Sequence, residues 1–387
     1  MSEAGLAAIR ETLVGAGDRG CCRIDLIGSC TLIDASVWDG VVLASGGGIF
    51  HSHAWHAALE QAPPGRTDVA HLLAYHGDEL VGVCPAYLVH DCPRLNHAFS
   101  LDRPRDLSIE GPILLSHSLA ALAGGPVAVP GHSEALDALD EGLRRAAGLL
   151  AAWAYGYANV SATPLSGRLL GRGFAVAEVA TDYQLTVEWD SPAAYWAAMR
   201  SRRRRTLRTV RARTEAAGIR VASEPVPPDE ATRLVHALLS DRGTPLSILP
   251  GNFLRAAMRQ LAPYERSVVA RDNEGTPCAA FIGWQFGTER SMWLAGLDTN
   301  RTKIYEPYHA MLAEVVETAI AERVATVDLG RSNGDVKHRY GARPRPLLLA
   351  LNSPYRDRNA LLHLWCRDLE QHHHAVLNGL ESASRCC

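Results

Sequence analysis

The 387-residue chain has almost no lysine. Of its 39 basic residues only Lys303 and Lys337 are lysine, and the others are arginine. Such a bias is typical of a GC-rich coding sequence in which arginine is the default cation. Arginine carries a planar guanidinium and lysine a compact ammonium, so the two side chains are not interchangeable in a closely packed binding site. The two lysines, both within residues 303–337, are therefore candidate functional residues.

The sequence also lacks the long apolar segments of membrane and exported proteins. No window approaches the ~18 consecutive apolar residues of a transmembrane helix. The N-terminal residues MSEAGLAAIRETLVG contain acids and lack the basic start and apolar run of a signal peptide. We therefore expect a cytoplasmic protein with no membrane partner.

Metal-binding patterns are missing as well. None of the nine cysteines forms a C-x-x-C pair with zinc spacing. An odd count in a cytoplasmic chain indicates mostly reduced thiols. The run His372-His373-His374 could bind a metal, but it lies in a predicted polar helix near the C-terminus, which favours a solvated helix face. The sequence therefore predicts no metal and no cofactor.

The composition is that of an ordinary globular protein, with 47% hydrophobic and 21% charged residues. At roughly 150 residues per domain, the length predicts two or three domains. The net charge of −3 excludes no class of partner by itself. The basic residues are, however, unevenly placed, with a cluster of arginines at residues 200–213.

The second half has clear start and stop signals. Residues 181–188 alternate as a strand, and Ser191-Pro192 marks a helix start that leads through Trp196 to a C-cap at Gly218. The elements that we then expect are a strand at 219–223, helices at 229–240 and 252–261, strands at 267–271, 278–286 and 291–297, a helix at 305–322, a strand at 326–329, a Gly/Asn loop, a strand at 347–351 and a helix at 359–377.

In the first half the signals for helices and strands are weaker, but they follow the same order of elements as in the second half. We expect a helix at 3–14, a strand at 23–28, a helix capped by Asp34, another capped by Ser52, and a hairpin of 70–76 with 80–90. A mixed sheet with helices on both faces is the natural packing, so the predicted class is α/β with mixed α+β sheets. The predicted domains are 1–175 and 176–387, the second including the terminal helix. The element order is that of the GNAT acyltransferase fold, present twice.

Four segments, in this order and spacing, carry a resemblance to a known family. They are Phe50-His51-Ser52-His53-Ala54-Trp55 (F-x-S-x-x-W), Glu110-Gly111-Pro112-Ile113, the basic helix at 196–218, and residues 328–342 (D-x-G…K-x-x-[FY]-G). The set resembles the Fem-type (FemABX-like) tandem GNAT proteins and the related BioF-type acetyltransferase-domain proteins. It covers roughly residues 23–350.

The resemblance implies two acyltransferase-like halves and transfer of an acyl group to an amine. In the Fem-type branch the donor is an aminoacyl-tRNA and the product is a peptide bond. The lysine of the last motif, thought to stabilise the oxyanion in that branch, corresponds to Lys337. The residue before it is often aromatic in the family and is Val336 here.

The chemistry itself favours the same residues. Aminolysis of an ester or thioester needs a neutral amine, a stabilised oxyanion and two substrates held together. Lys337 suits the oxyanion role, and the alternative is a surface lysine in a loop. An acid or a backbone group could take the proton of the attacking amine, and the candidate acids are Asp335, Asp328, Asp298 and Glu306. Aminoacyl esters are activated, so the alternative is that no strong base is needed.

The arginine cluster is a candidate binding site for the phosphates of a tRNA, coenzyme A or a carrier-protein arm. The arginines expected to share one helix face are Arg200, Arg204, Arg208 and Arg211. The alternative is a solvated amphipathic helix. No acidic residue interrupts residues 200–213, a higher density of positive charge than a solubilising face needs.

One motif of ordinary acetyl-CoA enzymes is missing. Residues 298–307, at the start of the helix after the third central strand, contain no glycine for a phosphate-binding loop. Lys303 and Arg301 are possible phosphate or ribose contacts there. The remaining candidates for substrate binding are Arg242, Tyr305, Trp55 and Ser52.

We therefore expect an aminoacyl-tRNA-dependent transferase that forms an amide on a small amine acceptor, in specialised-metabolite or cell-wall precursor biosynthesis. The expected partners are charged tRNA and that acceptor. One alternative is an N-acyltransferase using acyl-CoA or acyl carrier protein, and another is a non-catalytic tandem GNAT binding scaffold.

Overall fold

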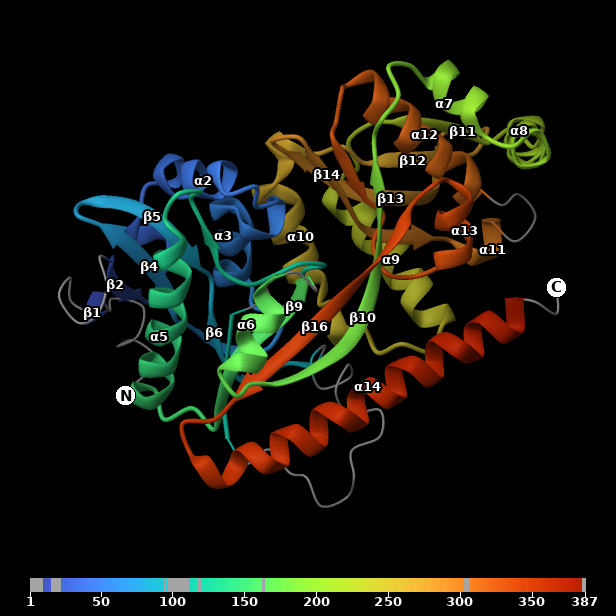
Figure 1. The fold of residues 1–387 in the computed structure, drawn as a ribbon. Helices are drawn as coiled ribbons and strands as arrows, with labels where there is room; N and C mark the ends of the chain where they lie inside the picture. Colours follow the sequence, from blue (N-terminus) through green and yellow to red (C-terminus); the bar gives the residue numbers. More distant parts are fainter. Residues whose placement is uncertain are drawn as a thin grey trace. The chain divides into compact units, whose positions relative to one another are not determined.

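The computed structural model describes residues 10–14, 22–93, 95, 111–116, 120–161, 164–302 and 307–384 (Figure 1). The chain divides into two compact units. Unit 1 comprises Met1–Thr181 and Arg345–Cys387, and unit 2 comprises Asp182–Pro344. Strands β10 (Ala175–Thr186) and β16 (Arg343–Asn352) each run from one unit into the other.

Unit 1 contains two groups of strands. An antiparallel sheet has the order β1-β2-β4-β5-β8, and a second, mixed set has the order β16-β9-β7-β6-β3. The strands are β1 (Arg10–Val14), β2 (Cys22–Ile27), β3 (Arg66–Val69), β4 (His71–His76), β5 (Glu79–Cys84), β6 (Tyr87–Asp91), β7 (Ile113–Ser116), β8 (Val127–Ala128) and β9 (Ala154–Ser161).

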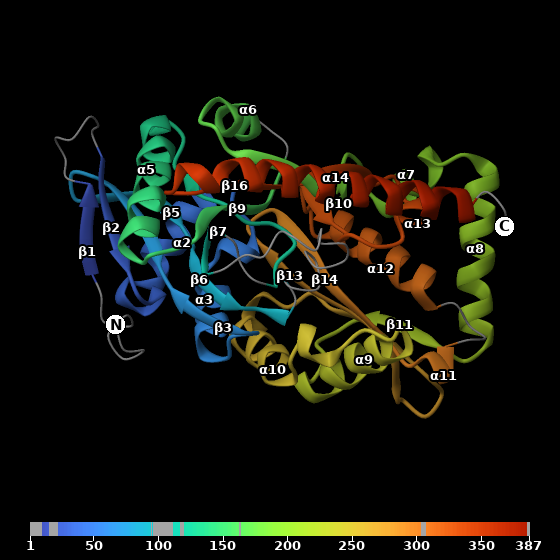
Figure 2. The same cartoon turned by 90° about the horizontal axis from the view of Figure 1, so that it is seen from below.

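The helices of unit 1 cover these strands. They are η1 (Cys30–Leu32), α2 (Ala35–Ala44), η2 (Ile49–His51), α3 (His53–Gln61), α5 (Ser133–Leu149), α6 (Pro164–Gly171) and α14 (Arg356–Ser384). Helix α5 packs on β2, β4 and β5 (Figure 2). Its buried Leu139 and Leu143 join Ile24 and Leu72 in one apolar core, whose burial is the main stabilising term of the unit.

Unit 2 is built on one mixed set of strands in the order β11-β12-β13-β14-β15-β10. Its strands are β11 (Arg220–Ser223), β12 (Val268–Arg271), β13 (Pro277–Phe286), β14 (Glu289–Leu297) and β15 (Thr326–Asp328). Its helices are α7 (Pro192–Ala198), α8 (Ser201–Ala216), α9 (Pro228–Asp241), η3 (Leu246–Ile248), α10 (Gly251–Gln260), η4 (Ala262–Tyr264), α11 (Thr299–Thr302), α12 (Pro307–Ala321) and α13 (Gly334–Arg339).

Helices lie on both faces of the sheet of unit 2. Helix α12 packs on β11, β12 and β13 and is itself contacted by α7 and α8, whereas α9 packs on β13 and β14 (Figure 2). The contact with α9 is so close that a Cβ on Gly296 would lie 2.7 Å from the Cβ of Leu234. This mixed sheet covered on both faces agrees with the expected α/β class.

Several predicted elements differ from the structure. Within the helix predicted at 3–14, residues 10–14 form strand β1, and residues 3–9 lie outside the described part. Arg10 pairs with Ile27 of β2, so cross-strand pairing overrides the local helical pattern. The predicted strand 80–90 is two strands, β5 and β6, which belong to different sets of strands. Pro85 lies between them and has no N–H for a continuous ladder.

The basic helix predicted to run from Trp196 to Gly218 is also two helices. Met199 and Arg200 have extended ψ values of 145° and 135°, which end α7 and begin α8. The guanidinium of Arg204 donates to three carbonyls near this break, those of Trp196, Ala197 and Met199.

The last helix, α14, belongs to unit 1. The predicted domain 176–387 had placed it with the second half of the chain. Leu362, Trp365 and Cys366 of α14 are buried, and the Cys366 thiol donates to the carbonyl of Ala175 at 3.6 Å. His373 was expected on a solvated face, but its Nε2 lies 3.5 Å from Glu178 Oε1. Helix α14 therefore packs with unit 1, because its apolar side finds its partners there.

Candidate functional site

A pocket opens in unit 2 where two parallel strands separate. Strands β14 and β15 pair over three positions only, ending with Ser291 opposite Asp328. Beyond that point β14 continues, while the chain after β15 turns away into a loop. Openings beyond the carboxyl ends of strands are common ligand sites in α/β proteins. The pocket has a volume of about 50 Å³ and is lined by Phe281, Met292, Trp293, Leu294, Ala295, Tyr308, Leu312, Leu329, Gly330, Arg331, Ser332 and Lys337.

The loop after β15 is held in shape by residues of unusual backbone conformation. Gly330 has a φ of +76° and Asn333 has a φ of +58°, both in the left-handed region. Asn333 is the N-cap position of α13. Gly334 then packs so closely on Tyr183 that a Cβ there would lie 2.0 Å from the phenol oxygen. The short helix α13 therefore packs against β10, and its fourth residue, Lys337, faces inward.

Lys337 is almost completely buried, with only 3% of its surface exposed. Its Nζ lies 5.7 Å from the centre of the Tyr183 ring, within the range of a cation–π contact. Burial lowers the pKa of Lys337 to about 8, because charge is costly to desolvate, while Asp328 and Asp182 act in the opposite direction. The lysine is therefore mostly protonated at pH 7, but its proton is held far less tightly than that of a surface lysine. The expected alternative of a surface loop lysine is contradicted.

The two acids that act on Lys337 are themselves buried. Asp328 is 1% exposed, and its Oδ1 accepts the N–H of Gly330 at 2.7 Å. Asp182 is fully buried on the neighbouring strand β10. Asp328 thus both fixes the start of the loop and supplies negative charge close to Lys337.

Two further side chains belong to the surroundings of this pocket. Burial raises the pKa of Tyr308, while a hydrogen bond with Asn333 and the charge of Arg242 act to lower it. Arg242, the C-cap of α9, is exposed and lies near enough to act electrostatically on this phenol. Arg242 does not line the pocket itself, but its charge acts on Tyr308, which lines the pocket together with Lys337.

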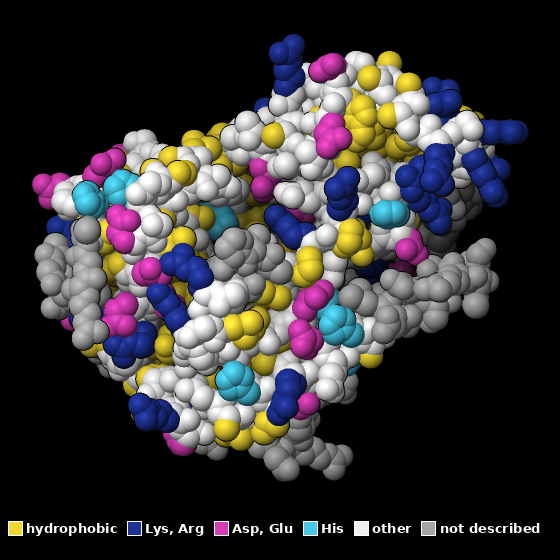
Figure 3. Space-filling model, viewed as in Figure 1, with side chains coloured by type: hydrophobic (Ala, Val, Ile, Leu, Met, Phe, Trp, Pro, Cys, Tyr) yellow, Lys and Arg dark blue, Asp and Glu magenta, His cyan; other side chains and the backbone are white. Residues whose placement is uncertain are grey.

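Two larger grooves lie beside the arginine-rich helix α8. One has a volume of about 470 Å³ and is lined by Trp189, Tyr195, Ala198, Met199, Arg200, Arg203, His338, Tyr340 and Gly341. The other has a volume of about 670 Å³ and is lined by Arg200, Arg202, Arg203, Thr206, Leu207, Val210, His309 and Arg339. Figure 3 shows Lys and Arg side chains gathered over this part of unit 2.

The four arginines expected to share one binding face have different environments. Arg200 is exposed and lines both grooves. Arg204 is engaged with the carbonyls at the end of α7, and Arg211 pairs with Glu317 at 2.9 Å. Arg208 is exposed and does not line either groove. Only Arg200 of the four thus lies in the groove lining, and Arg202, Arg203 and Arg339 join it.

The pocket and the grooves share their walls. On α13, Lys337 lines the pocket, whereas the next residues, His338 and Arg339, line the grooves. On α12, Tyr308 lines the pocket and His309 a groove. The pocket and the grooves are therefore lined by successive residues of the same two helices.

The remaining expected site residues lie elsewhere. Asp335 is exposed in the first turn of α13, whereas Lys337 is buried, so the two side chains do not share a side of the helix. Ser52 and Trp55 belong to unit 1 and are buried, with Ser52 Oγ accepting the N–H of Trp55 at 3.2 Å as the N-cap of α3. Lys303 and Tyr305 lie outside the described residues.

Sequence reasoning did not select Asp182, Tyr183, Met292, Tyr308 and Asn333, which line or flank the pocket. The groove residues Arg203 and Arg339 lie in the arginine cluster and in the last motif, but they were not chosen as binding residues. Asp182 was visible as an acid in the alternating strand 181–188, and Tyr308 as the fourth residue of the helix expected at 305–322. Neither position has chemical meaning in the sequence until the strands are paired, because β10 and β15 come together only in the sheet.

The comparisons with known proteins agree with this geometry. A family model described as "Acetyltransferase (GNAT) domain" matches residues 201–340. No curated protein matches the sequence. Among solved structures, FemX matches with a TM-score of 0.59 at 11% identity, over 82% of this chain and 96% of that one.

Two other structures of similar extent match the chain. The C-terminal domain of a protein described as a lysylphosphatidylglycerol synthetase from Agrobacterium fabrum has a TM-score of 0.53 at 12% identity, covering 88% of this chain and 98% of its own. A tandem GNAT protein from the clavulanic acid biosynthesis pathway has a TM-score of 0.52 at 12% identity, covering 86% and 99%.

The chain therefore has the Fem-type tandem GNAT fold, and its second unit contains a GNAT acyltransferase domain. The expected fold class and the expected resemblance are confirmed. Among the residues that the structure describes, no helix is both long enough and apolar enough to cross a membrane.

Proposed function

We propose that this acyltransferase moves an aminoacyl group from a charged tRNA to the amine of a small acceptor and forms an amide bond. The observation that carries the proposal is that Lys337 is buried and lines a pocket, while the neighbouring residues of the same short helix line the arginine-rich grooves. The donor is a substrate, so the reaction needs no separate cofactor.

The reaction gives Lys337 a defined task. The acceptor nitrogen attacks the ester carbonyl, the bond to the ribose oxygen of the tRNA breaks, and the proton of the attacking amine passes to that leaving oxygen. Negative charge develops on the carbonyl oxygen in between. A preorganised donor at such an oxyanion is typically worth about 3–4 kcal/mol. Lys337 supplies this charge from a site where burial strengthens it, because little water competes.

The grooves suit a donor with a phosphate backbone. Arg200, Arg202, Arg203 and Arg339 line them, and sequence-independent binding of nucleic acids depends on such contacts. FemX and the lysylphosphatidylglycerol synthetase are neighbours in fold, and the name of the second, which contains a lysyl group, fits the transfer of an aminoacyl group. The acceptor is proposed to be an amine of specialised-metabolite or cell-wall precursor biosynthesis, small enough to reach the pocket.

A second candidate is an N-acyltransferase that uses acyl-CoA or an acyl carrier protein. The family model describes an acetyltransferase domain, and the same arginines can bind the phosphates of coenzyme A. Against this stands the segment 298–307, which has no glycine to let phosphates approach the backbone closely.

Donor discrimination tests the proposal. The purified chain is incubated with total tRNA charged with labelled amino acids and, separately, with labelled acyl-CoAs, in extract of its own organism as the source of acceptor. We expect label in a small product from charged tRNA, lost after RNase treatment and lost with Lys337→Met. Transfer from acyl-CoA alone would overturn the tRNA proposal and select the second candidate. Transfer from neither donor would leave a carrier-protein donor or a binding scaffold.

A further inference from the structure

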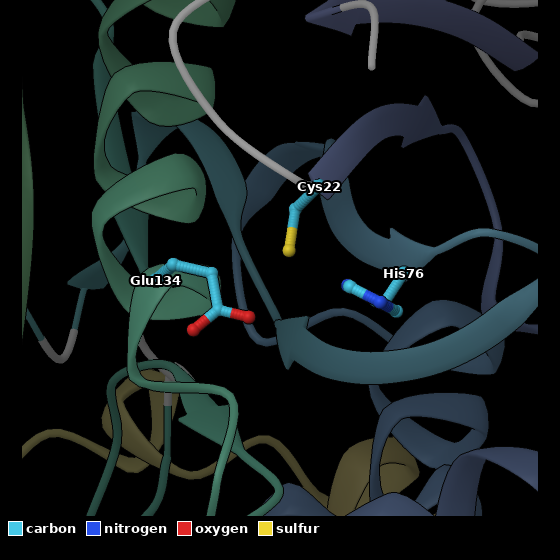
Figure 4. Close-up of side chains that lie close together, drawn as sticks. All are labelled: Cys22, His76 and Glu134. Carbon is cyan, nitrogen blue, oxygen red and sulfur yellow. The ribbon is translucent and has the colours of Figure 1, made fainter. Parts of the chain in front are cut away.

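Three potential metal ligands meet in unit 1, far from one another in the sequence. Cys22 begins β2 and His76 ends β4, and these two residues are directly opposite in the antiparallel pair. Directly opposite residues of a pair point to the same face of the sheet. Glu134 lies in the first turn of α5, which packs on these strands, and Figure 4 shows its carboxylate beside the two strand ends.

The ligand atoms are close enough for a common ion. The Cys22 thiol, a ring nitrogen of His76 and a carboxylate oxygen of Glu134 all lie within 4.8 Å of one another. In a tetrahedral site with bonds of about 2.0–2.3 Å, ligand atoms are roughly 3.3–3.7 Å apart. The three therefore need to approach by about one ångström, and the exposed His76 has room to turn.

We propose that Cys22, His76 and Glu134 bind one Zn²⁺ ion. The ligand set of one thiolate, one imidazole and one carboxylate matches the sulfur, nitrogen and oxygen donors that zinc takes in proteins. Thiolate and imidazole also disfavour Mg²⁺ and Ca²⁺, which prefer oxygen ligands. Nothing in the proposed acyl transfer requires this site, which belongs to the other unit.

His132 completes the arrangement as a positioning residue. It precedes α5, its Nδ1 lies 3.4 Å from Glu134 Oε1, and its ring centre lies 5.2 Å from that of His76. Partners of this kind orient a ligating carboxylate, and their loss typically weakens metal binding by about 10–100-fold. The fourth coordination position is filled by water.

The site would tie helix α5 to the two hydrogen-bonded strands on which it packs. An ion held by β2, β4 and the first turn of α5 ties the helix to the ends of the strands that it covers. Cys22 must lose its proton to bind, so binding releases a proton and weakens as the pH falls. Since the ligands come together only in the folded unit, zinc stabilises the folded state.

The test uses the full chain, treated with a chelator and dialysed, and titrated with Zn²⁺ by calorimetry and with Co²⁺ by absorption. We expect one equivalent of zinc, a thiolate-to-cobalt charge-transfer band, and a zinc-dependent rise in the melting temperature. Cys22→Ser and His76→Ala should each weaken binding by more than about 100-fold, more than loss of the outer partner does in His132→Ala.

Matched controls separate these ligands from the other thiols and histidines. Cys84→Ser removes another buried thiol of the same sheet, and His90→Ala removes a histidine paired with Asp68. Both should bind zinc as the wild type does. Each variant is also measured in a His372→Gln/His374→Gln background, which removes two histidines of α14 as a second source of binding.

The proposal is overturned if the wild-type chain takes up no stoichiometric zinc, or if Cys22→Ser keeps both the affinity and the charge-transfer band. Binding that disappears only in the His372→Gln/His374→Gln background would assign the metal to α14 and equally overturn it.

Discussion

Among the described residues, each unit has a pair of parallel strands, and the two pairs differ in the side chains that surround them. In unit 1, β7 and β9 pair from Ile113 opposite Ala154 to Ser116 opposite Tyr157. Large side chains occupy this region: Tyr157 is 1% exposed, packs near Phe174 and donates to Asp140 at 2.6 Å. The hydroxyl of the buried Ser116 accepts the thiol hydrogen of Cys84 at 3.2 Å.

In unit 2 the corresponding pair, β14 and β15, separates beside a pocket. The polar groups there are a buried cation, Lys337, and the acids Asp328 and Asp182. Beside its parallel pair, unit 1 has the hydrogen-bonded hydroxyls of Tyr157 and Ser116, whereas unit 2 has the buried amine of Lys337 at a pocket. The comparison shows that the arrangement of parallel strands is common to both units and does not by itself define an active site. The buried charge of Lys337 beside the pocket is what makes unit 2 the expected catalytic unit.

The largest expected effect is on turnover. Lys337→Met removes the oxyanion donor, and we expect the rate of transfer from charged tRNA to fall about 10²–10³-fold. The matched change in unit 1 is Tyr157→Phe, which should reduce turnover less than about threefold and cost about 1 kcal/mol of stability through the lost hydrogen bond. Single-turnover rates and denaturant unfolding measure both. If Tyr157→Phe abolishes turnover and Lys337→Met does not, the assignment of chemistry to unit 2 is wrong.

The next effect is on binding of the donor. Arg200→Ala/Arg203→Ala removes two groove arginines, while Arg208→Ala/Arg213→Ala removes the same charge from exposed positions of α8 outside the grooves. The first double variant should weaken tRNA binding about tenfold or more and lower the slope of log affinity against log salt by about 2. The second should change both much less. Equal losses in the two variants would show that net charge alone matters.

The pH dependence should show the unusual lysine. With the pKa of Lys337 near 8, the required charge is present at pH 7 and is lost as the pH rises above 8. We expect single-turnover transfer to decline on the alkaline side, after correction for donor hydrolysis. Lys337→Arg stays charged over this range, so the activity of this variant should not decline between pH 7 and pH 9.5. A wild-type profile that is flat to pH 9.5 would contradict the oxyanion role.

The smallest expected effect is on stability. Lys337→Met should stabilise the folded protein, although the same substitution lowers turnover. The pKa of Lys337 falls from 10.5 to about 8 on folding, so the folded state binds this proton less tightly than the unfolded chain does. The resulting penalty is fully present below pH 8 and disappears as the pH rises through 10.5. Lys337→Met should therefore raise the free energy of unfolding at pH 7 by about 1–3 kcal/mol. Denaturant unfolding at pH 7 and pH 10 checks this, and a clear loss of stability at pH 7 would contradict it.

Much of the scaffold could be predicted from local signals. The N-caps Asp34, Ser52 and Ser191 accept the backbone N–H groups that their positions indicated. The strands of the second half lie within a few residues of their expected places, because apolar periodicity and turn residues act locally. The errors arose where distant partners decided, as in β1, which pairs with β2, and in α14, whose apolar side packs in unit 1.

The sequence by itself determined the GNAT element order, the scarcity of lysine and the candidate Lys337, since each depends on residue type and spacing along the chain. Only the tertiary structure decided that Lys337 is buried beside Tyr183 and two acids, that Arg204 and Arg211 are engaged in structural contacts, and that Cys22, His76 and Glu134 meet. Burial and charge proximity depend on how strands pair and helices pack, and these contacts join residues that the linear sequence keeps far apart.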